Sequence, residues 1–242
     1  MVVKHGSPCG IARAPTQQEA IARAIAADRV SAFGGIVAID HVLDLASAQA
    51  LGSLFLEVVA APAVTPDAVA HLMATKKNCR VVTLPLVAAT KTARTALGGT
   101  LMQAADDALP EPLTWTTPTL RSVADLELCS FAWLACKHVK SNAIVLAVRE
   151  GVVLATVGIG GGQTNRIDAV HQACARAGEQ ARGAVLASDA FFPFADGVEA
   201  AAQAGVAVVM QPGGALRDAE VIAAADRLEL AMVLTHRRHF RH

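Results

Sequence analysis

The last third of the chain alternates short apolar runs with amphipathic stretches, and this alternation restricts the fold more than any other feature of the sequence. Residues 184–188, 206–210 and 231–234 have the length and apolar character of buried strands. Residues 196–204 and 218–228, which separate them, have the spacing of helices. Strands that alternate with helices pack as layers around a largely parallel or mixed sheet. The sequence therefore predicts an α/β fold.

The rest of the chain continues this pattern on both sides of an irregular stretch. Before that stretch we expect strands at residues 2–5, 36–39 and 58–61 and helices at residues 16–28, 45–56 and 65–75. After it we expect a helix at residues 124–140, strands at residues 143–148 and 152–159, and a helix at residues 166–177. The irregular stretch holds Pro110, Pro112 and Pro118, after a bent strand expected at residues 97–102. It predicts a boundary between two lobes, residues 1–123 and 124–242.

The composition excludes several classes of protein. Apolar residues make up 53% of the chain and aromatic residues only 4%, so we expect a core of alanine and branched aliphatic side chains. The formal net charge of zero gives no general attraction for nucleic acid. Charges or glycines interrupt the longest apolar runs, so no membrane span is expected. The five scattered cysteines and the lack of a recognisable signal peptide indicate reduced thiols in a cytoplasmic protein.

Two residues suited to polar chemistry, Lys4 and His5, are neighbours at the end of the first expected strand. Adjacent side chains of a strand point to opposite faces, so both reach one site only where the strand ends or bends. The Ser7-Pro8 pair that follows supports such an end. A solvated strand end is the alternative interpretation.

Further segments place polar residues beside apolar or glycine-rich stretches. Lys140-Ser141-Asn142 precedes an expected strand. A glycine-rich turn at residues 158–162 leads to Arg166, and such a turn can direct backbone N–H groups and a guanidinium towards an anion. Residues 188–194 contain three of the seven phenylalanines, which favours a pocket wall for a flat ring. The alternative interpretations are plain turns for the first two segments and ordinary core packing for the phenylalanine-rich segment. The basic tail from His236 follows an apolar strand directly, so we expect it to be either pinned or frayed.

Two catalytic patterns are incomplete in this sequence. Pro8-Cys9-Gly10 is similar to half of a zinc deaminase site, but the second cysteine and the His-x-Glu half are missing. The Gly-x-Ser-x-Gly turn of serine hydrolases is missing too. We therefore expect no zinc and assign no metal ligands.

Six motifs follow one another in an order that resembles a known family. They are Lys-His-x-x-Pro-Cys-Gly from residue 4, Ser-Ala-Phe-Gly-Gly from 31, Lys-His-Val-Lys-Ser-Asn-Ala-Ile-Val from 137, Ser-Asp-Ala-Phe-Phe-Pro-Phe from 188, Gln-Pro-Gly-Gly from 211 and Arg-His-Phe-Arg-His from 238. Together they resemble the AICAR transformylase part of the PurH family, the bifunctional AICAR formyltransferase/IMP cyclohydrolases of purine biosynthesis. The resemblance covers nearly the whole chain. It implies two cytidine-deaminase-like lobes (three-layer αβα) without zinc, and a homodimer with active sites between its subunits.

The resemblance also implies a reaction, the transfer of a formyl group from 10-formyltetrahydrofolate to the 5-amino group of AICAR, on the route to IMP. The AICAR amine is a weak nucleophile because its lone pair is delocalised, so a base must take its proton during attack. Histidine suits that task, since its ordinary pKa is close to neutral pH. The oxyanion that forms on the formyl carbon needs a fixed cation or donor.

Site residues follow from the resemblance by their places in the motifs. The implied catalytic residues are His5 as the base, Lys4 for charge stabilisation and folate departure, and Asn142 as a hydrogen-bond partner of the formyl group or amine. The implied AICAR-binding residues are Gly34, Glu57, Arg166, Phe191 and Arg238. The residues implied to border the folate are Asn165, Ala190, Phe192 and Pro193. A bound monovalent cation is a further implied ligand, for which the sequence contains no motif.

The chain departs from the family pattern in two places. We expect the chain to lack the IMP cyclohydrolase domain and the opening of the transformylase part with its Arg-Tyr-Gly…Asn-Pro-His-Gln segment. That segment supplies an arginine and a tyrosine to the nucleotide site, whereas this chain has no tyrosine. We therefore expect an N-terminally incomplete chain that turns over slowly unless a separate N-terminal segment or cyclohydrolase domain is its partner. The alternatives are a catalytically incomplete nucleotide- or folate-binding module and a dimerisation remnant.

Overall fold

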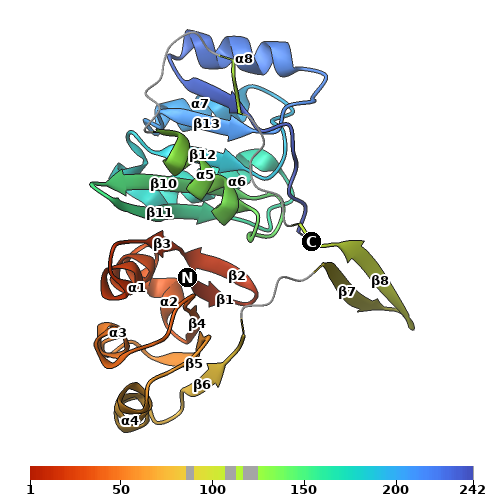
Figure 1. Ribbon diagram of the computed structural model, residues 1–242. Helices are drawn as coiled ribbons and strands as arrows, with labels where there is room; N and C mark the ends of the chain where they lie inside the picture. Colours follow the sequence, from red (N-terminus) through yellow and green to blue (C-terminus); the bar gives the residue numbers. More distant parts are fainter. Residues whose placement is uncertain (86–89, 107–112, 117–124, 242) are drawn as a thin grey trace.

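The computed structural model describes residues 1–85, 90–106, 113–116 and 125–241. The strands in this part of the chain form a five-stranded first sheet, a seven-stranded second sheet and a two-stranded hairpin (Figure 1). The hairpin consists of β7 (Lys91–Ala96) and β8 (Gly99–Ala104) and projects from the rest of the molecule.

The first sheet is built from the N-terminal residues in the strand order β2-β1-β4-β5-β6. Its strands are β1 (Val2–Lys4), β2 (Ser7–Gly10), β4 (Gly35–Ala38), β5 (Leu56–Ala61) and β6 (Arg80–Thr83). Strand β1 is antiparallel to β2 and β4, whereas β4, β5 and β6 are parallel. The helices of this part are α1 (Gln17–Ala26), α2 (Arg29–Ala32), α3 (Leu45–Ala50) and α4 (Pro66–Thr75). Thr16, Asp28 and Asp44 cap the first three by accepting hydrogen bonds from first-turn N–H groups.

The second sheet has the strand order β3-β11-β10-β12-β13-β14-β9. Its strands are β3 (Ala12–Arg13), β9 (Thr114–Trp115), β10 (Ile144–Glu150), β11 (Val153–Gly160), β12 (Val185–Ser188), β13 (Val208–Gln211) and β14 (Ala231–Leu234). Its helices are α5 (Asp125–Cys136), α6 (Arg166–Ala177), the 3-10 helix η1 (Gly178–Ala181), α7 (Asp196–Gln203) and α8 (Asp218–Arg227). Because β3 follows β2 directly but pairs with β11, the chain crosses from one sheet to the other within its first 13 residues.

Five strands of the second sheet repeat the topology of the first. In the order β11-β10-β12-β13-β14, strand β10 is antiparallel to β11 and β12, and β12, β13 and β14 are parallel. The first sheet has this same pattern in the order β2-β1-β4-β5-β6. The connecting helices correspond as well. In the first part of the chain α1, α3 and α4 connect the strands, and α6, α7 and α8 connect the matching strands of the second sheet in the same order. One supersecondary arrangement therefore occurs twice in the chain.

The two sheets differ in how many of their faces carry helices. In the second sheet, Val145 and Ala147 of β10 belong to the core beneath α5, whereas Ile144 and Leu146 belong to the core beneath α6, α7 and α8. This sheet is therefore the middle of three layers. Within the described residues, the first sheet has one core, which joins its strands to α1, α3 and α4 on one side, as Figure 1 shows.

The structure confirms the α/β class with mixed sheets, and it corrects several of the expected elements. The helix expected at residues 124–140 ends at Cys136. The helix expected at residues 45–56 ends at Ala50, because Gly52 turns the chain with a φ of +55° and β5 begins at Leu56. The bent strand expected at residues 97–102 is instead the end of a hairpin, in which Leu97 and Gly98 form the turn with positive φ. The expected lobe boundary at residues 123–124 lies outside the described residues.

The glycine-rich turn begins later than the sequence predicted. Gly158 and Gly160 lie within β11, under α6. A Cβ atom added at Gly158 would lie 2.1 Å from the Ala173 carbonyl oxygen, and one at Gly160 would lie 2.1 Å from that of Ala169. These glycines therefore allow close contact between helix and strand, and the turn itself starts at Gly161.

We expect Gly158→Ala to lower the free energy of unfolding by about 1–3 kcal/mol, since the new methyl group would force α6 away from β11. Gly99→Ala is a matched control, because the nearest atom to a Cβ there is 3.5 Å away on the exposed hairpin. Urea unfolding of both variants measures the difference. Equal stability of the two variants would show that the helix can shift without cost.

Candidate functional site

Lys4 and His5 lie where the first strand ends, as the sequence predicted. Strand β1 ends at Lys4, and His5 and Gly6 form the hairpin turn to β2 with φ values of +52° and +79°. The Lys4 ammonium donates a hydrogen bond to the Phe33 carbonyl oxygen, while the His5 side chain is exposed. The turn frees the two side chains from the strict alternation of a strand, and both line one crevice.

This crevice has a volume of about 220 Å³ and lies between the first and second sheets. On one side it is lined by Lys4, His5, Ser7, Pro8, Cys9 and Ser31, and on the other by Val139, Ile159, Gly161, Gln172 and Arg176. The hairpin turn of the first sheet thus faces the glycine-rich loop and α6 of the second.

Asn142 belongs to a loop that is tied to the glycine-rich loop of the crevice. Its backbone N–H and its Nδ2 atom both donate to the Gln163 carbonyl oxygen, at 3.2 and 2.9 Å. The N–H of Gly162 donates to the Lys140 carbonyl oxygen at 2.7 Å. The two loops therefore hold each other in place, although the Asn142 side chain itself is not among those that line the crevice.

The buried ion pair of Arg166 and Asp189 orients the Asn142 side chain. Arg166, at the first position of α6, places Nη1 2.6 Å from Oδ1 of Asp189, and both side chains are almost completely buried. Its Nη2 atom donates to Oδ1 of Asn142 at 2.6 Å. Asp189 also accepts hydrogen bonds from the Ala143 N–H at 3.0 Å and from the Ser141 hydroxyl. Here Arg166 links α6 to the Asn142 loop, and its expected contact with the nucleotide stays a prediction.

Phe191 and Arg238 meet at the carboxyl ends of the parallel strands, the end of an α/β sheet where ligands usually bind. The Arg238 guanidinium lies over the Phe191 ring, 4.7 Å from its centre. The loop of Phe191 is fixed by Gln211, whose side chain accepts a hydrogen bond from the Phe192 N–H at 2.9 Å. The structure therefore brings these two predicted residues together, with the cation stacked on the ring.

Of the remaining predicted AICAR-binding residues, Glu57 lies on the first sheet and Gly34 in the turn just before β4. Gly34 adjoins Lys4, because a Cβ atom added to it would lie 3.6 Å from the lysine Nζ atom. Glu57 is exposed on β5 and pairs with Arg80 on β6 at 3.1 Å. Gly34 therefore belongs with the hairpin turn, whereas Glu57 does not line the crevice.

The residues expected to border a folate occupy three different environments. Asn165 is exposed and caps α6 by accepting a hydrogen bond from the Asp168 N–H at 2.8 Å. Ala190 is buried, and Pro193, two residues after Phe191 in the sequence, is exposed. The Phe192 side chain is fully buried in the core beneath α6, α7 and α8, so it serves the packing of that layer. Their contact with folate stays a prediction.

The basic C-terminal tail is pinned beside the Asp189 network. The His239 N–H donates to the Asp189 carbonyl oxygen at 2.8 Å, and the Ser141 N–H donates to that of Arg241 at 2.9 Å. The His239 ring is buried against Trp133, with ring centres 3.9 Å apart, and its Nδ1 atom lies 2.5 Å from the Asp106 carboxylate. The tail therefore supports the loops that carry Asn142 and Asp189.

Burial of His239 makes the stability of this region depend on pH. Burial lowers the pKa of His239, and the Asp106 carboxylate opposes this to a smaller extent. The unfolded chain therefore takes up the proton at higher pH than the folded chain, so the free energy of unfolding should fall as pH decreases below about 6.5. We expect His239→Asn to flatten this dependence between pH 7 and 5.5, and Asp106→Asn to steepen it, in urea unfolding. If the free energy of unfolding depended on pH in both variants as it does in the wild type, His239 would not be the cause of the pH dependence.

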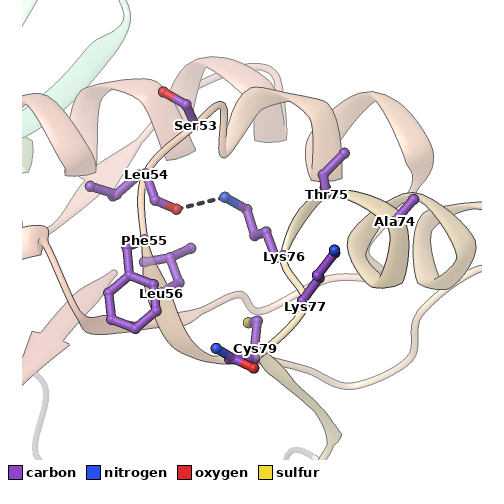
Figure 2. A pocket seen from close by; sticks show the side chains of 10 residues that line it. Ser53, Leu54, Phe55, Leu56, Ala74, Thr75, Lys76, Lys77 and Cys79 are labelled. Carbon is purple, nitrogen blue, oxygen red and sulfur yellow. Dashed lines mark hydrogen bonds between the residues drawn. The ribbon is translucent and has the colours of Figure 1, made fainter.

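A second hollow, of about 320 Å³, lies at the opposite ends of β5 and β6 from their carboxyl ends (Figure 2). Of the two lysines that line it, Lys76 donates hydrogen bonds to the carbonyl oxygens of Gly52 and Leu54 at 2.9 and 2.6 Å. Figure 2 shows the Lys76 side chain pointing to the Leu54 carbonyl oxygen. None of the site residues predicted from the sequence lines this hollow, and the Lys76 ammonium group is already bonded to the backbone.

Thiols and possible metal ligands are two further kinds of reactive group in the described residues. The five cysteines are free thiols, and burial raises the pKa of Cys9, the one that lines the crevice, which leaves it a poor nucleophile. Within the described ranges, no three His, Cys, Asp or Glu side chains are grouped so that they could hold a metal ion.

Sequence reasoning missed two residues of the crevice and one behind it. Gln172 accepts a hydrogen bond from the Gly161 N–H at 3.1 Å, and Arg176 donates to the Ile159 carbonyl oxygen at 2.7 Å. Both lie on α6, and their spacing of four residues places them on one face of that helix. Asp189 was noticed only as part of the phenylalanine-rich segment, because nothing in the sequence indicates that it pairs with Arg166.

Comparison with known proteins decides the family. A model of the AICARFT/IMPCHase bienzyme family matches residues 1–176, which include both the hairpin turn and the glycine-rich loop. The chain belongs to this family. AICARFT/IMPCHase relatives that match it include the bifunctional purine biosynthesis protein PurH of Synechococcus elongatus, 48% identical over 245 residues, and that of Myxococcus xanthus, 47% identical over 252 residues.

These AICARFT/IMPCHase relatives are about twice as long as the chain. Each match covers all of this chain but only 47% of the Synechococcus elongatus protein and 48% of the Myxococcus xanthus protein. The same holds for PurH of Prochlorococcus marinus, 49% identical over 251 residues, of which the match covers 47%.

Among the described helices of the chain, none is long and apolar enough to cross a membrane.

Proposed function

We propose that the chain is an AICAR formyltransferase of purine biosynthesis, which transfers the formyl group of 10-formyltetrahydrofolate to the 5-amino group of AICAR. One observation carries the proposal: Lys4 and His5 face the glycine-rich loop across a single crevice, and that loop is bonded to the loop of Asn142. A protein that only bound a nucleotide would not need an exposed histidine beside a lysine at this point. The names of the relatives, which include purine biosynthesis, support the same pathway.

In the proposed reaction the amine nitrogen of AICAR forms a bond to the formyl carbon while His5 takes a proton from that nitrogen. Lys4 and the Asn142 amide stabilise the negative charge that develops on the formyl oxygen. The bond between the formyl carbon and the folate nitrogen then breaks, and that nitrogen takes up a proton as tetrahydrofolate leaves. Stacking of a planar base on Phe191, with a phosphate near Arg238, would place the nucleotide.

We also propose that each copy of the repeated topology is a cytidine-deaminase-like lobe. The shared strand order of the two sheets supports this assignment, and the separate cores beneath them support two lobes. The homodimer, the bound monovalent cation and a partner that supplies the missing segment or cyclohydrolase domain stay predictions.

The proposal is tested by mixing the purified chain with AICAR and 10-formyltetrahydrofolate and following tetrahydrofolate by absorbance. We expect slow turnover by the chain and none by the Lys4→Ala/His5→Ala variant. AICAR binding without turnover in both proteins would instead favour the alternative of a binding module. A folded chain that neither binds AICAR nor turns over would contradict the proposal.

A further inference from the structure

One face of the first sheet is apolar and carries none of the described helices. Pairing across β1, β4, β5 and β6 places six apolar residues on this face, which we call the open face: Val3, Ile36, Ala38, Val58, Ala60 and Val82. All of them are partly exposed, with Ile36 at 37%, whereas the neighbours Val37 and Val59 on the other face are fully buried. A contiguous apolar sheet face of this kind usually marks an interaction surface.

The repeated topology identifies what covers the corresponding face of the second sheet. That face is covered by α5, a helix of 12 residues that leads into β10. Its Ala132, Trp133 and Cys136 side chains share a core with Val145 and Ala187 of the sheet. Because β1 occupies the position of β10 in the repeat, the open face is the equivalent of the face beneath α5.

The surroundings of the open face are also suited to a helix. An apolar hollow of about 400 Å³ adjoins it, lined by Met1, Ala38 and Ile39 from the first sheet and by Phe131 and Leu134 from α5. A helix on the open face would fill this hollow and pack beside α5. Arg80, which its pairing with Val58 places on the open face as well, forms an ion pair with Glu57, so the six apolar residues favour an apolar occupant.

We propose that the open face binds an α-helix with an apolar face, equivalent to α5, from the half of AICARFT/IMPCHase proteins that this chain does not span. The relatives have more than half of their length outside the match, which is ample for such a helix. The helix completes a third layer over the first sheet, as α5 does over the second. The inference rests on topology and on the family, and it does not require the proposed catalytic activity.

The test uses the part of Synechococcus elongatus PurH that does not align with this chain, produced as a separate polypeptide. We expect it to bind the chain and to slow hydrogen exchange of the backbone amides in β4 and β5. Ile36→Asp should weaken binding at least about tenfold, since a charge would enter the apolar contact. Val152→Asp is the matched control, because Val152 is 66% exposed in the turn between β10 and β11 and should leave binding unchanged.

Three results would overturn the inference. The wild-type chain could fail to bind the added polypeptide, or Ile36→Asp and Val152→Asp could weaken binding equally. Sedimentation could also show that the chain dimerises through the open face, with Ile36→Asp restoring the monomer, which would make a second copy the occupant. Ala60→Asp repeats the test at a second position, and urea unfolding of each variant verifies that it is folded.

Discussion

Replacing Asp189 by asparagine is expected to lower the free energy of unfolding by about 3–5 kcal/mol, the largest effect on stability in this site. The substitution leaves the Arg166 guanidinium buried without its counter-charge, since Nη1 lies 2.6 Å from Oδ1 of Asp189 and the arginine is only 8% exposed. It also weakens the hydrogen bond that the Ala143 N–H donates to the carboxylate. Urea unfolding at pH 7 measures the change.

Two controls separate this ion pair from a general effect of losing a carboxylate. Asp226→Asn changes an exposed carboxylate on α8 and should change stability by less than about 0.5 kcal/mol. The double variant Arg166→Met/Asp189→Asn should be more stable than Asp189→Asn alone, because it no longer buries an unpaired charge. Additive losses in the double variant would show that the two side chains act independently.

His5 is expected to control the rate of turnover. We expect His5→Ala to reduce kcat for formyl transfer by about 10²–10⁴, the usual contribution of a positioned base, while AICAR binding changes little. His41→Ala is the matched control, because His41 is an exposed histidine of the same part of the chain that pairs with Asp40. Tetrahydrofolate formation gives kcat, and titration calorimetry gives the affinity for AICAR. An unchanged kcat in His5→Ala would remove His5 from the mechanism.

Much of this architecture could be predicted because it depends on local patterns. Buried strands such as β12 and β14 are continuous apolar runs, and the caps Thr16 and Asn165 mark where α1 and α6 begin. The sequence also predicted that the first strand ends near His5, where a turn lets both Lys4 and His5 reach one crevice.

The parts that could not be predicted depend on contacts between distant segments. The use of Gly158 and Gly160 for close packing became clear only once α6 was placed on β11. The pairing of Arg166 with Asp189, and of the tail at His239 with the same loop, joins residues from different strands and helices. Neither spacing nor composition carries that information, since the residues meet only after the second sheet has formed.

In the proposed enzyme, the hairpin turn of Lys4 and His5 and the loop of Asn142 form one substrate site. Hydrogen–deuterium exchange of the chain with and without saturating AICAR tests it most directly, because it reports both segments in one experiment. We expect slower exchange at residues 4–7, at 140–142 and at 161–163 together, with no change in the hairpin of β7 and β8. Protection of the first segment without the other two, or of neither in the presence of bound AICAR, would contradict it.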